Sequence, residues 1–161
     1  MVVTPKVGKL GMKEGPDAVV ADLPVANKKA LFQALGGIAE RSMGLPARDV
    51  VDRLNERERL GTTGFGGGVA IPHGRMQGLD GIRAAFVKLD RPIDYGAIDD
   101  LPIDLVFMLL SPVDAGADHL KALAQVSRLL RDRSFVAKLR GTGSPDALFA
   151  LFANPETRDA A

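Results

Sequence analysis

One uninterrupted apolar run constrains the fold of this chain more than any other feature. Residues 105–110 read Leu-Val-Phe-Met-Leu-Leu and are apolar at every position. A strand with one face in water alternates apolar and polar side chains, because successive side chains point to opposite faces of a sheet. A strand that is apolar on both faces is typical of a sheet covered by helices on both sides. The run therefore predicts an α/β fold.

Helical periodicity lies on both sides of a strand-rich middle part, and we expect five helices in all. They cover residues 27–44, 46–59, 117–130, 134–141 and 144–152. Several ends carry helix signals: Asn27, Ser134 and Ser144 as N-caps, Pro46 and Pro145 at first helical positions, and Gly44, Gly61 and Gly141 as stops. The third helix has its apolar stripe at Leu120, Leu123, Val126 and Leu130.

Three strands are expected between the second and third helices. They lie in residues 69–73, 82–89 and 102–112, and residues 90–102 form a turn-rich connection between the last two. Helices and strands do not alternate one by one along the chain. This order favours a single-domain sandwich, in which a mixed parallel and antiparallel β-sheet has helices on both faces.

The bulk properties set the domain count. The chain has 161 residues, 46% of them hydrophobic and 25% charged, which suits one globular domain. Residues 1–16 are rich in glycine, proline and lysine without apolar periodicity, so we expect a loosely ordered N-terminal arm. The domain then covers residues 17–153, and residues 154–161 form a C-terminal tail.

Charge and composition exclude several classes of function. With 21 basic and 20 acidic residues, no overall field favours nucleic acid or an anionic membrane. No apolar stretch reaches the roughly 18 residues of a membrane span, and the start of the chain lacks the apolar core of a signal peptide. The absence of cysteine fits a reducing compartment. We therefore expect a cytoplasmic protein that neither binds nucleic acid nor inserts into a membrane.

The segment Gly61–Met76, GTTGFGGGVAIPHGRM, holds the candidate chemistry. It matches neither the dinucleotide fingerprint G-x-G-x-x-G nor the phosphate-binding P-loop. Its glycines let backbone N–H groups approach an anion closely. Pro72 and Gly74 frame His73 at the end of a short apolar strand. A neutral imidazole beside anion-binding donors is suited to accept a phosphoryl group itself.

Other interpretations of these residues are weaker. His73 could be an exposed histidine beside a flexible turn, although its rigid frame argues against that. Zinc would need His73 and His119 together with a carboxylate such as Asp114 or Asp118, and the sequence has no close metal-ligand spacing. No G-x-S-x-G elbow supports a serine hydrolase. We expect neither a metal nor a cofactor.

At this point a family resemblance emerges. Residues 57–76, RERLGTTGFGGGVAIPHGRM, resemble the active-site segment of enzyme IIA domains of the bacterial phosphotransferase system, in the fructose and mannitol superfamily. The segment looks most like the nitrogen-related, regulatory branch. Residues 28–41 and 119–132 extend the similarity, which covers about 17–152.

The resemblance implies roles for individual residues. His73 is the phosphoryl acceptor through Nε2, with an HPr-like phosphocarrier as donor. Arg57 clamps the phosphoryl oxygens, and His119 orients His73 or hydrogen-bonds the phosphoryl group. Without the resemblance, Arg57 would be a solvated helix charge and His119 a helix-capping residue. Glu58 is expected to be a structural partner. The expected phosphoryl-binding loop comprises Thr63, Gly64, Gly66, Gly67 and Gly68.

Two further expectations concern the surroundings of His73. At Gly67 this branch commonly has asparagine, so we expect a more flexible loop that lacks any hydrogen bond made by that side chain. A rim for docking a phosphocarrier is expected at Phe65, Arg75, Met76 and Met108, with core packing an equal alternative for Met108.

These features together predict a phosphotransferase component, a phosphohistidine protein of bacterial signal transduction. Its phosphorylation state would control partners such as transporters or sensor kinases. One alternative is a sugar-specific enzyme IIA that passes phosphate to a separate IIB protein for uptake of a fructose- or mannitol-type sugar. Another is a regulator that binds its partners independently of phosphorylation. A homodimer is left open.

Overall fold

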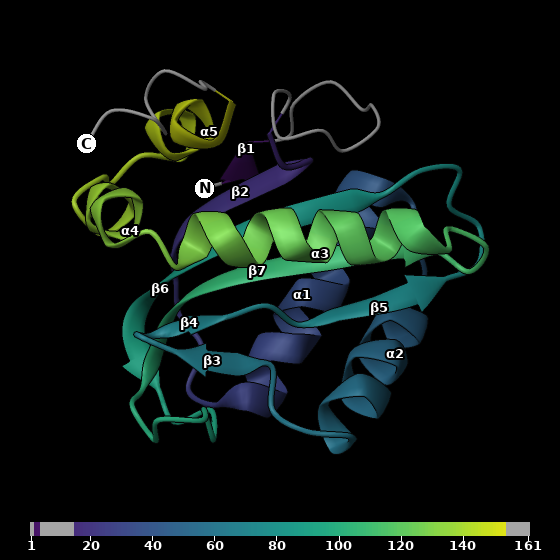
Figure 1. Ribbon diagram of the computed structural model, residues 1–161, viewed down its shortest axis with the longest axis horizontal. Helices are drawn as coiled ribbons and strands as arrows, with labels where there is room; N and C mark the ends of the chain where they lie inside the picture. Colours follow the sequence, from purple (N-terminus) through teal and green to yellow (C-terminus); the bar gives the residue numbers. More distant parts are fainter. Residues whose placement is uncertain (1, 4–14, 154–161) are drawn as a thin grey trace.

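The computed structural model describes residues 2–3 and 15–153, in which one seven-stranded sheet carries five helices (Figure 1). The strands are β1 (Val2–Val3), β2 (Ala18–Leu23), β3 (Gly64–Gly66), β4 (Val69–Ala70), β5 (His73–Met76), β6 (Arg83–Ile93) and β7 (Ile103–Pro112). The helices are α1 (Lys28–Met43), α2 (Ala47–Arg59), α3 (Ala117–Leu130), α4 (Arg133–Arg140) and α5 (Pro145–Ala153). The expected C-terminal tail, and positions 1 and 4–14 of the expected N-terminal arm, lie outside the described residues.

The sheet is mixed, as predicted. Its order is β1-β2-β6-β7-β4-β3, and β5 also pairs with β7. Strands β2 and β6 are parallel, β6 and β7 antiparallel, and β4 and β5 both run parallel to β7. Because β4 pairs with residues 105–106 and β5 with residues 109–112, these two short strands follow one another along the same side of β7.

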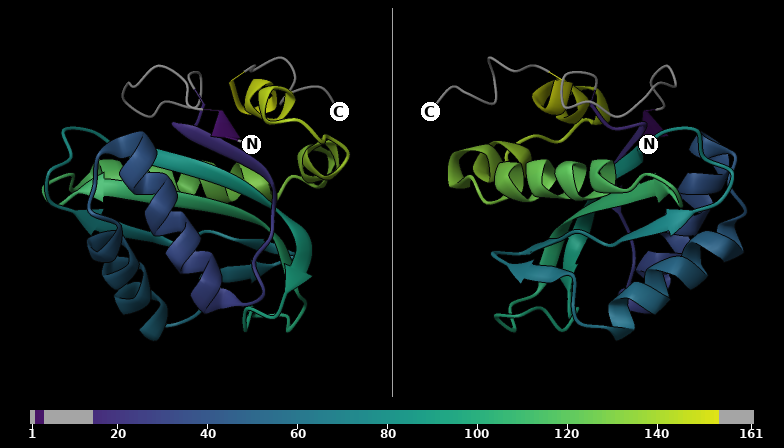
Figure 2. Two further views of the ribbon diagram at one scale, coloured as in Figure 1. Left: turned by 180° about the vertical axis from the view of Figure 1, so that it is seen from behind. Right: turned by 45° about the vertical axis from the view of Figure 1, so that its right-hand side comes forward.

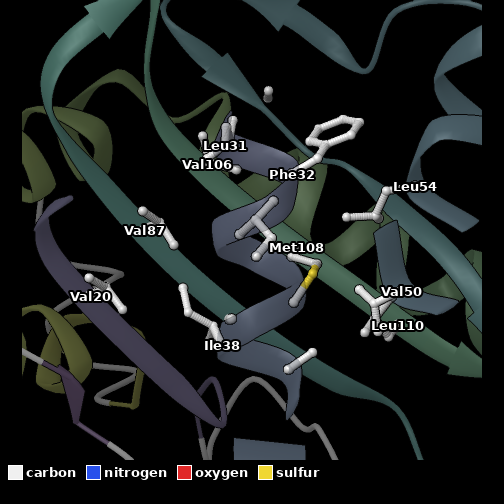
Figure 3. Packing of buried hydrophobic residues seen from close by; sticks show 14 of the residues in the cluster. Val20, Leu31, Phe32, Ile38, Val50, Leu54, Val87, Val106, Met108 and Leu110 are labelled. Carbon is white, nitrogen blue, oxygen red and sulfur yellow. The ribbon is translucent and has the colours of Figure 1, made fainter. Parts of the chain in front are cut away.

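The apolar run in β7 is the centre of two cores, which confirms the expected sandwich. Val106, Met108 and Leu110 belong to the core under α1 and α2, where Figure 3 shows Met108 among side chains of both helices. The odd-numbered residues 105, 107 and 109 belong to the core under α3, α4 and α5. The two helical layers lie on opposite sides of the sheet in Figure 2.

The helix ends agree with the capping signals at some positions and differ at others. Asn27 caps α1 through a bond from the Ala30 N–H, and Gly44 ends it in the left-handed conformation. Ser144 caps α5 by accepting from the Ala147 N–H. The expected Ser134 cap is wrong, because Asp132 caps α4 and accepts from the N–H groups of residues 134 and 135. Helix α2 has Leu60, rather than Gly61, as its C-cap.

No helix in residues 15–153 has the length and apolar character needed to cross a bilayer.

Three local expectations were incomplete. Strand β6 continues through Pro92 to Ile93, so part of the turn-rich connection is strand, and its pairing with β7 is irregular after Lys88. Strand β2 was not foreseen, although it lies between β1 and β6 in the sheet. Of the expected stripe on α3, Val126 and Leu130 are buried and Leu123 packs against the core, but Leu120 is 62% exposed and His119 is buried instead.

Candidate functional site

His73 lies where the strand beside β7 is interrupted. The chain leaves the ladder after β4 and re-enters it at His73, which pairs with Leu109. At the break, the Pro72 carbonyl accepts the Leu109 N–H at 3.0 Å. The Ile71 carbonyl instead faces the imidazole, 2.7 Å from Nδ1. Because a carbonyl oxygen can only accept, Nδ1 must carry the proton. In the neutral ring this leaves the lone pair on Nε2.

Arg57 lies at the other nitrogen of the same ring. It belongs to the last turn of α2 and its Nε–H donates to His73 Nε2 at 3.2 Å. Its Nη1 donates to the Gly61 carbonyl at 2.9 Å, which holds the guanidinium against the start of the glycine-rich segment. Both contacts of His73 therefore define the same tautomer, with Nε2 as the nucleophilic atom.

The surroundings keep His73 uncharged. Burial lowers the pKa of His73 below its usual 6.5, and the positive charge of Arg57 acts in the same direction. The hydrogen bond to Ile71 and the charge of Glu58 raise the pKa, but they do not compensate. At neutral pH the imidazole is therefore neutral, which a nitrogen nucleophile requires.

His119 lies beside His73, with the two ring centroids 5.7 Å apart. It is the third residue of α3 and is only 6% exposed. Its Nδ1 is 2.6 Å from the hydroxyl of Ser111, a fully buried residue of β7. Burial lowers the pKa of His119 to about 4, and the nearby Arg75 and His73 add to this effect. His119 is thus a second neutral imidazole, held by the central strand.

Glu58 organises the chain between α2 and the glycines. Its carboxylate accepts from Lys28 Nζ at 2.9 Å, from the Thr63 hydroxyl at 2.5 Å and from the Thr63 N–H at 3.1 Å. The Tyr95 hydroxyl completes the network, 2.7 Å from that of Thr63. Burial would raise the pKa of Glu58, but the hydrogen bonds from Thr63 and Lys28 outweigh it and lower the pKa. These contacts fit the expected structural role of Glu58.

His73 opens onto a surface pocket of about 510 Å³, which we call the His73 pocket. Its lining is mainly charged or polar and comprises Arg53, Glu56, Arg57, Leu60, His73, Gly74, Arg75 and His119. Three arginines therefore surround the two imidazoles. Leu60 is 84% exposed at the edge of this pocket, which makes an apolar contact available beside the reactive nitrogen.

The structure brings together His73, Arg57 and His119, and places Arg75 with them. Gly66 and Gly67 line a different pocket, together with Phe65. The Gly67 N–H donates to Asp99 at 2.9 Å, and the Thr63 N–H to Glu58. The role of Thr63 and the glycines in phosphoryl binding stays a prediction, and none of them lines the His73 pocket.

The docking rim expected from the sequence needs correction at Met76, and at Met108 the alternative of core packing is confirmed. Met76 and Met108 are 4% and 0% exposed, because both pack into the core under α1 and α2. They cannot contribute to a surface rim. The exposed apolar residues Leu60, Leu120 and Val113 lie next to lining residues of the His73 pocket in sequence or space. Leu60 could have been noticed as the one apolar residue ending the charged stretch 55–59.

The zinc alternative finds no ligand set in the described part of the chain, where no three His, Cys, Asp or Glu side chains are grouped to hold a metal ion. Asp114 and Asp118 line a pocket whose lining includes neither histidine, together with Asp80 and Lys121.

Comparisons with known proteins show the family of this chain. Residues 15–154 match the family model described as phosphoenolpyruvate-dependent sugar phosphotransferase system, EIIA 2. A nitrogen regulatory protein of Bradyrhizobium diazoefficiens is 47% identical over 140 residues, which cover 87% of this chain and 92% of that protein. A fructose-specific EIIA component of Haloferax volcanii is 37% identical over 117 residues, 72% of this chain and 76% of that protein. The crystal structure of nitrogen regulatory protein IIA-Ntr from Neisseria meningitidis has a TM-score of 0.78 and 34% identity, covering 88% of this chain and 94% of that one.

Proposed function

Because the chain belongs to the phosphoenolpyruvate-dependent sugar phosphotransferase system EIIA 2 family, we propose that it is a phosphoryl carrier with a regulatory output, phosphorylated on His73. The observation that supports this most directly is the fixed tautomer of His73. Nδ1 is bonded to the Ile71 carbonyl, so Nε2 alone offers a lone pair toward the His73 pocket. We take the donor to be the phosphohistidine of an HPr-like phosphocarrier.

The transfer would proceed as a direct displacement. The Nε2 lone pair of His73 attacks phosphorus, an N–P bond forms, and the bond from phosphorus to the donor nitrogen breaks with its electron pair returning to that nitrogen. The Arg57 Nε–H, which lies on Nε2 at 3.2 Å, would move to a phosphoryl oxygen as the N–P bond forms. The proton on His73 Nδ1 stays there throughout, hydrogen-bonded to the Ile71 carbonyl, so the acceptor needs no general base.

His119 would assist as a neutral hydrogen-bond donor. If the Ser111 hydroxyl donates to Nδ1 of His119, the proton of that ring is on Nε2. A phosphoryl group on His73 could accept it. A neutral donor binds a phosphoryl oxygen without trapping it as tightly as a second cation would, which suits a group that must be passed on.

The regulatory output would follow from charge. A phosphoryl group adds about −1.5 to −2 charges at neutral pH. Here it would enter a pocket lined by three arginines and bordered by the exposed Leu60. A target protein, such as a transporter or a sensor kinase, that docks on this face would meet a different charge in each state.

The relatives carry two kinds of name, one of which supports the regulatory function and the other a sugar-uptake alternative. Identity to the nitrogen regulatory protein from Bradyrhizobium is 47%, against 37% to the fructose-specific EIIA component from Haloferax. This favours the regulatory branch. The alternative is transfer of phosphate from His73 to a separate IIB protein in sugar uptake.

Intact-protein mass spectrometry tests the proposal. The protein is incubated with phosphoenolpyruvate, the general phosphotransferase enzyme I and an HPr-like phosphocarrier, and the label is mapped at alkaline pH because phosphohistidine is acid-labile. Wild type should gain one phosphoryl group, and His73→Ala none. Equal labelling of the two would reject the assignment. Adding a IIB protein to the labelled protein distinguishes the regulatory function from the sugar-uptake alternative, because only the alternative requires transfer of the label to IIB.

The regulatory output has its own test. Binding of a transporter or sensor-kinase domain is measured for the unphosphorylated protein, the phosphorylated protein and His73→Ala. The proposal expects the phosphorylated protein to differ from the other two. Identical affinities for all three would favour a regulator that binds independently of phosphorylation.

A further inference from the structure

A second pocket is lined by residues of the β3–β4 hairpin and helix α4 and has no role in the proposed relay. It has a volume of about 730 Å³ and shares no lining residue with the His73 pocket. We call it the arginine pocket, and it is lined by Phe65, Gly66, Gly67, Val69, Asp99, Leu130, Arg131, Arg133, Val136, Ala137 and Arg140. These residues come from the β3–β4 turn, the β6–β7 connection, the end of α3 and helix α4. Its volume is within the usual range for small-molecule sites.

The floor of the arginine pocket is apolar. Val69, Leu130 and Val136 are buried members of the core under α3, α4 and α5, and Phe65 packs against the same core. A ligand seated here would therefore place an apolar body against a rigid surface. Burial of apolar area contributes about 25 cal/mol per Å².

The rim is cationic, and its three arginines differ in their partners. Arg140 pairs with Asp104 through two hydrogen bonds of 2.8 and 2.9 Å, and donates to the Gly67 carbonyl at 2.7 Å. It therefore ties α4 to the β3–β4 turn. Arg131 and Arg133 have no carboxylate partner within residues 15–153. Two unpaired guanidinium groups thus flank an apolar floor.

Arg131 is also held in place. Its guanidinium carbon lies 5.2 Å from the centroid of the Phe65 ring, a cation–π arrangement that keeps the charge at the edge of the pocket. The one acidic lining residue, Asp99, already accepts the N–H groups of Gly67 and Leu101. Asp99 makes no ion pair with Arg131 or Arg133, and the lining holds three arginines against this one carboxylate.

We propose that the arginine pocket binds a small organic anion, namely a carboxylate, sulfonate or phosphate ester carried on a planar apolar body. The anionic group would contact Arg131 and Arg133, whose planar guanidinium groups can each donate two parallel hydrogen bonds. The planar body would lie on Phe65, Val69 and Val136. The concave shape favours a small molecule over a protein surface. This site is additional to the phosphoryl relay and does not depend on it.

Titration of the ¹⁵N-labelled protein with 8-anilinonaphthalene-1-sulfonate tests the proposal. Saturable one-to-one shifts are expected at the amides of Gly66, Gly67, Val69 and Ala137. The double variant Arg131→Gln/Arg133→Gln should bind about tenfold or more weakly, because it loses the charged hydrogen-bond donors. Ala137→Trp keeps the charge but fills the pocket, and it should also weaken binding.

Matched controls make the result decisive. Arg41→Gln/Arg48→Gln removes the same charge from the opposite helical layer and should leave the affinity unchanged, as should His73→Ala. The uncharged analogue N-phenyl-1-naphthylamine and sulfate alone should each bind more weakly than the sulfonate. Equal affinity of wild type and Arg131→Gln/Arg133→Gln, or shifts confined to residues around His73, would overturn the proposal. Because His73→Ala should still bind the sulfonate, this test does not depend on the outcome of the phosphorylation test.

Discussion

The two ends of the segment Gly61–Met76 use their polar groups in opposite ways. At the His73 end, the Ile71 carbonyl and the Arg57 guanidinium both hydrogen-bond to the imidazole of His73, at Nδ1 and Nε2 respectively. The imidazole lines a surface pocket. At the glycine end, the polar groups of the turn bond to side chains from elsewhere in the chain: the Gly67 N–H donates to Asp99, and the Gly67 carbonyl accepts from Arg140. One end orients an imidazole at a surface pocket, and the other holds a turn in place.

This difference separates two roles that are adjacent in the sequence. Glycines ahead of a reactive histidine suggest a single anion-binding device, but here Gly66 and Gly67 line the arginine pocket. Their conformations serve the β3–β4 turn, where residues 66, 67 and 68 all have positive φ. The functional contribution of each end can therefore be tested separately.

The largest expected effect belongs to Arg57. Replacing it by glutamine removes the donor on Nε2, and we expect the rate of phosphoryl acceptance to fall by about 10²-fold, the usual cost of one lost transition-state donor. The rate is measured by rapid-quench mass spectrometry with the phosphorylated phosphocarrier. The matched variant at the glycine end, Arg140→Gln, should lower stability and leave the rate within about twofold. A comparable rate loss in Arg140→Gln would contradict the separation of the two ends.

The second-largest effect is expected for the loss of folding stability at low pH, which should originate at the histidine end. Since the folded-state pKa of His119 is about 4 against 6.5 when unfolded, the unfolded chain binds more protons between these values. Stability is therefore complete above about pH 6.5 and falls by up to about 3 kcal/mol as the pH drops toward 4. The lowered pKa of His73 acts in the same direction.

Chemical denaturation of wild type and His119→Gln across pH 4 to 7 checks this expectation. The variant should show a flatter dependence. The glycine end contributes to acid sensitivity only at lower pH. The hydrogen bond from the Gly67 N–H lowers the pKa of Asp99 below 3.8, so the stability that this group supplies is lost only as the pH falls through that lower pKa. An unchanged slope in His119→Gln would place the acid sensitivity elsewhere.

Gly68→Ala probes the tight packing of the turn. Gly68 has φ of 81°, and an added Cβ would meet the Arg140 guanidinium and lie 2.9 Å from Asp104 Oδ1. We expect a loss of about 1–3 kcal/mol in unfolding free energy, from backbone strain and displacement of the Arg140–Asp104 pair. Thermal and urea unfolding measure it. Phosphorylation of the folded variant should persist, and its loss would instead link the turn to the relay.

The smallest effect is expected at the neighbouring position. Gly67 has φ of 68°, a conformation that asparagine tolerates, and a Cβ there would meet no atom within 4 Å. Gly67→Asn should change the unfolding free energy by less than about 1 kcal/mol and leave the phosphorylation rate unaltered. A larger change in rate would show that the asparagine which the family commonly has at position 67 takes part in phosphoryl binding.

Local sequence signals predicted most of the helical framework. Asn27 and Gly44 delimit α1 because both act on the nearest helix end, without help from distant residues. Leu120 was misplaced for the opposite reason. Its predicted burial relied on helical spacing alone, whereas the buried residue at this end of α3 is His119, which lies 2.6 Å from the Ser111 hydroxyl on β7.

The site was predictable in part. His73 emerged from its Pro-Gly frame, while Arg57 and His119 required the family resemblance. Ser111, and the break in the strand at Ile71, could not be inferred, because each depends on how β4, β5 and β7 align. The same alignment buries Met76, which was expected at the surface, and Met108, for which core packing was an equal alternative.

The partner of His73 Nδ1 has a consequence for how this protein can change over generations. A histidine that is oriented by a side chain can lose that partner through a single codon change. Here the acceptor is the carbonyl of Ile71, which every amino acid possesses. Drift at position 71 can alter the packing of the core but cannot erase the atom that fixes the tautomer. The tautomer that the proposed transfer requires is thereby inherited with the path of the backbone.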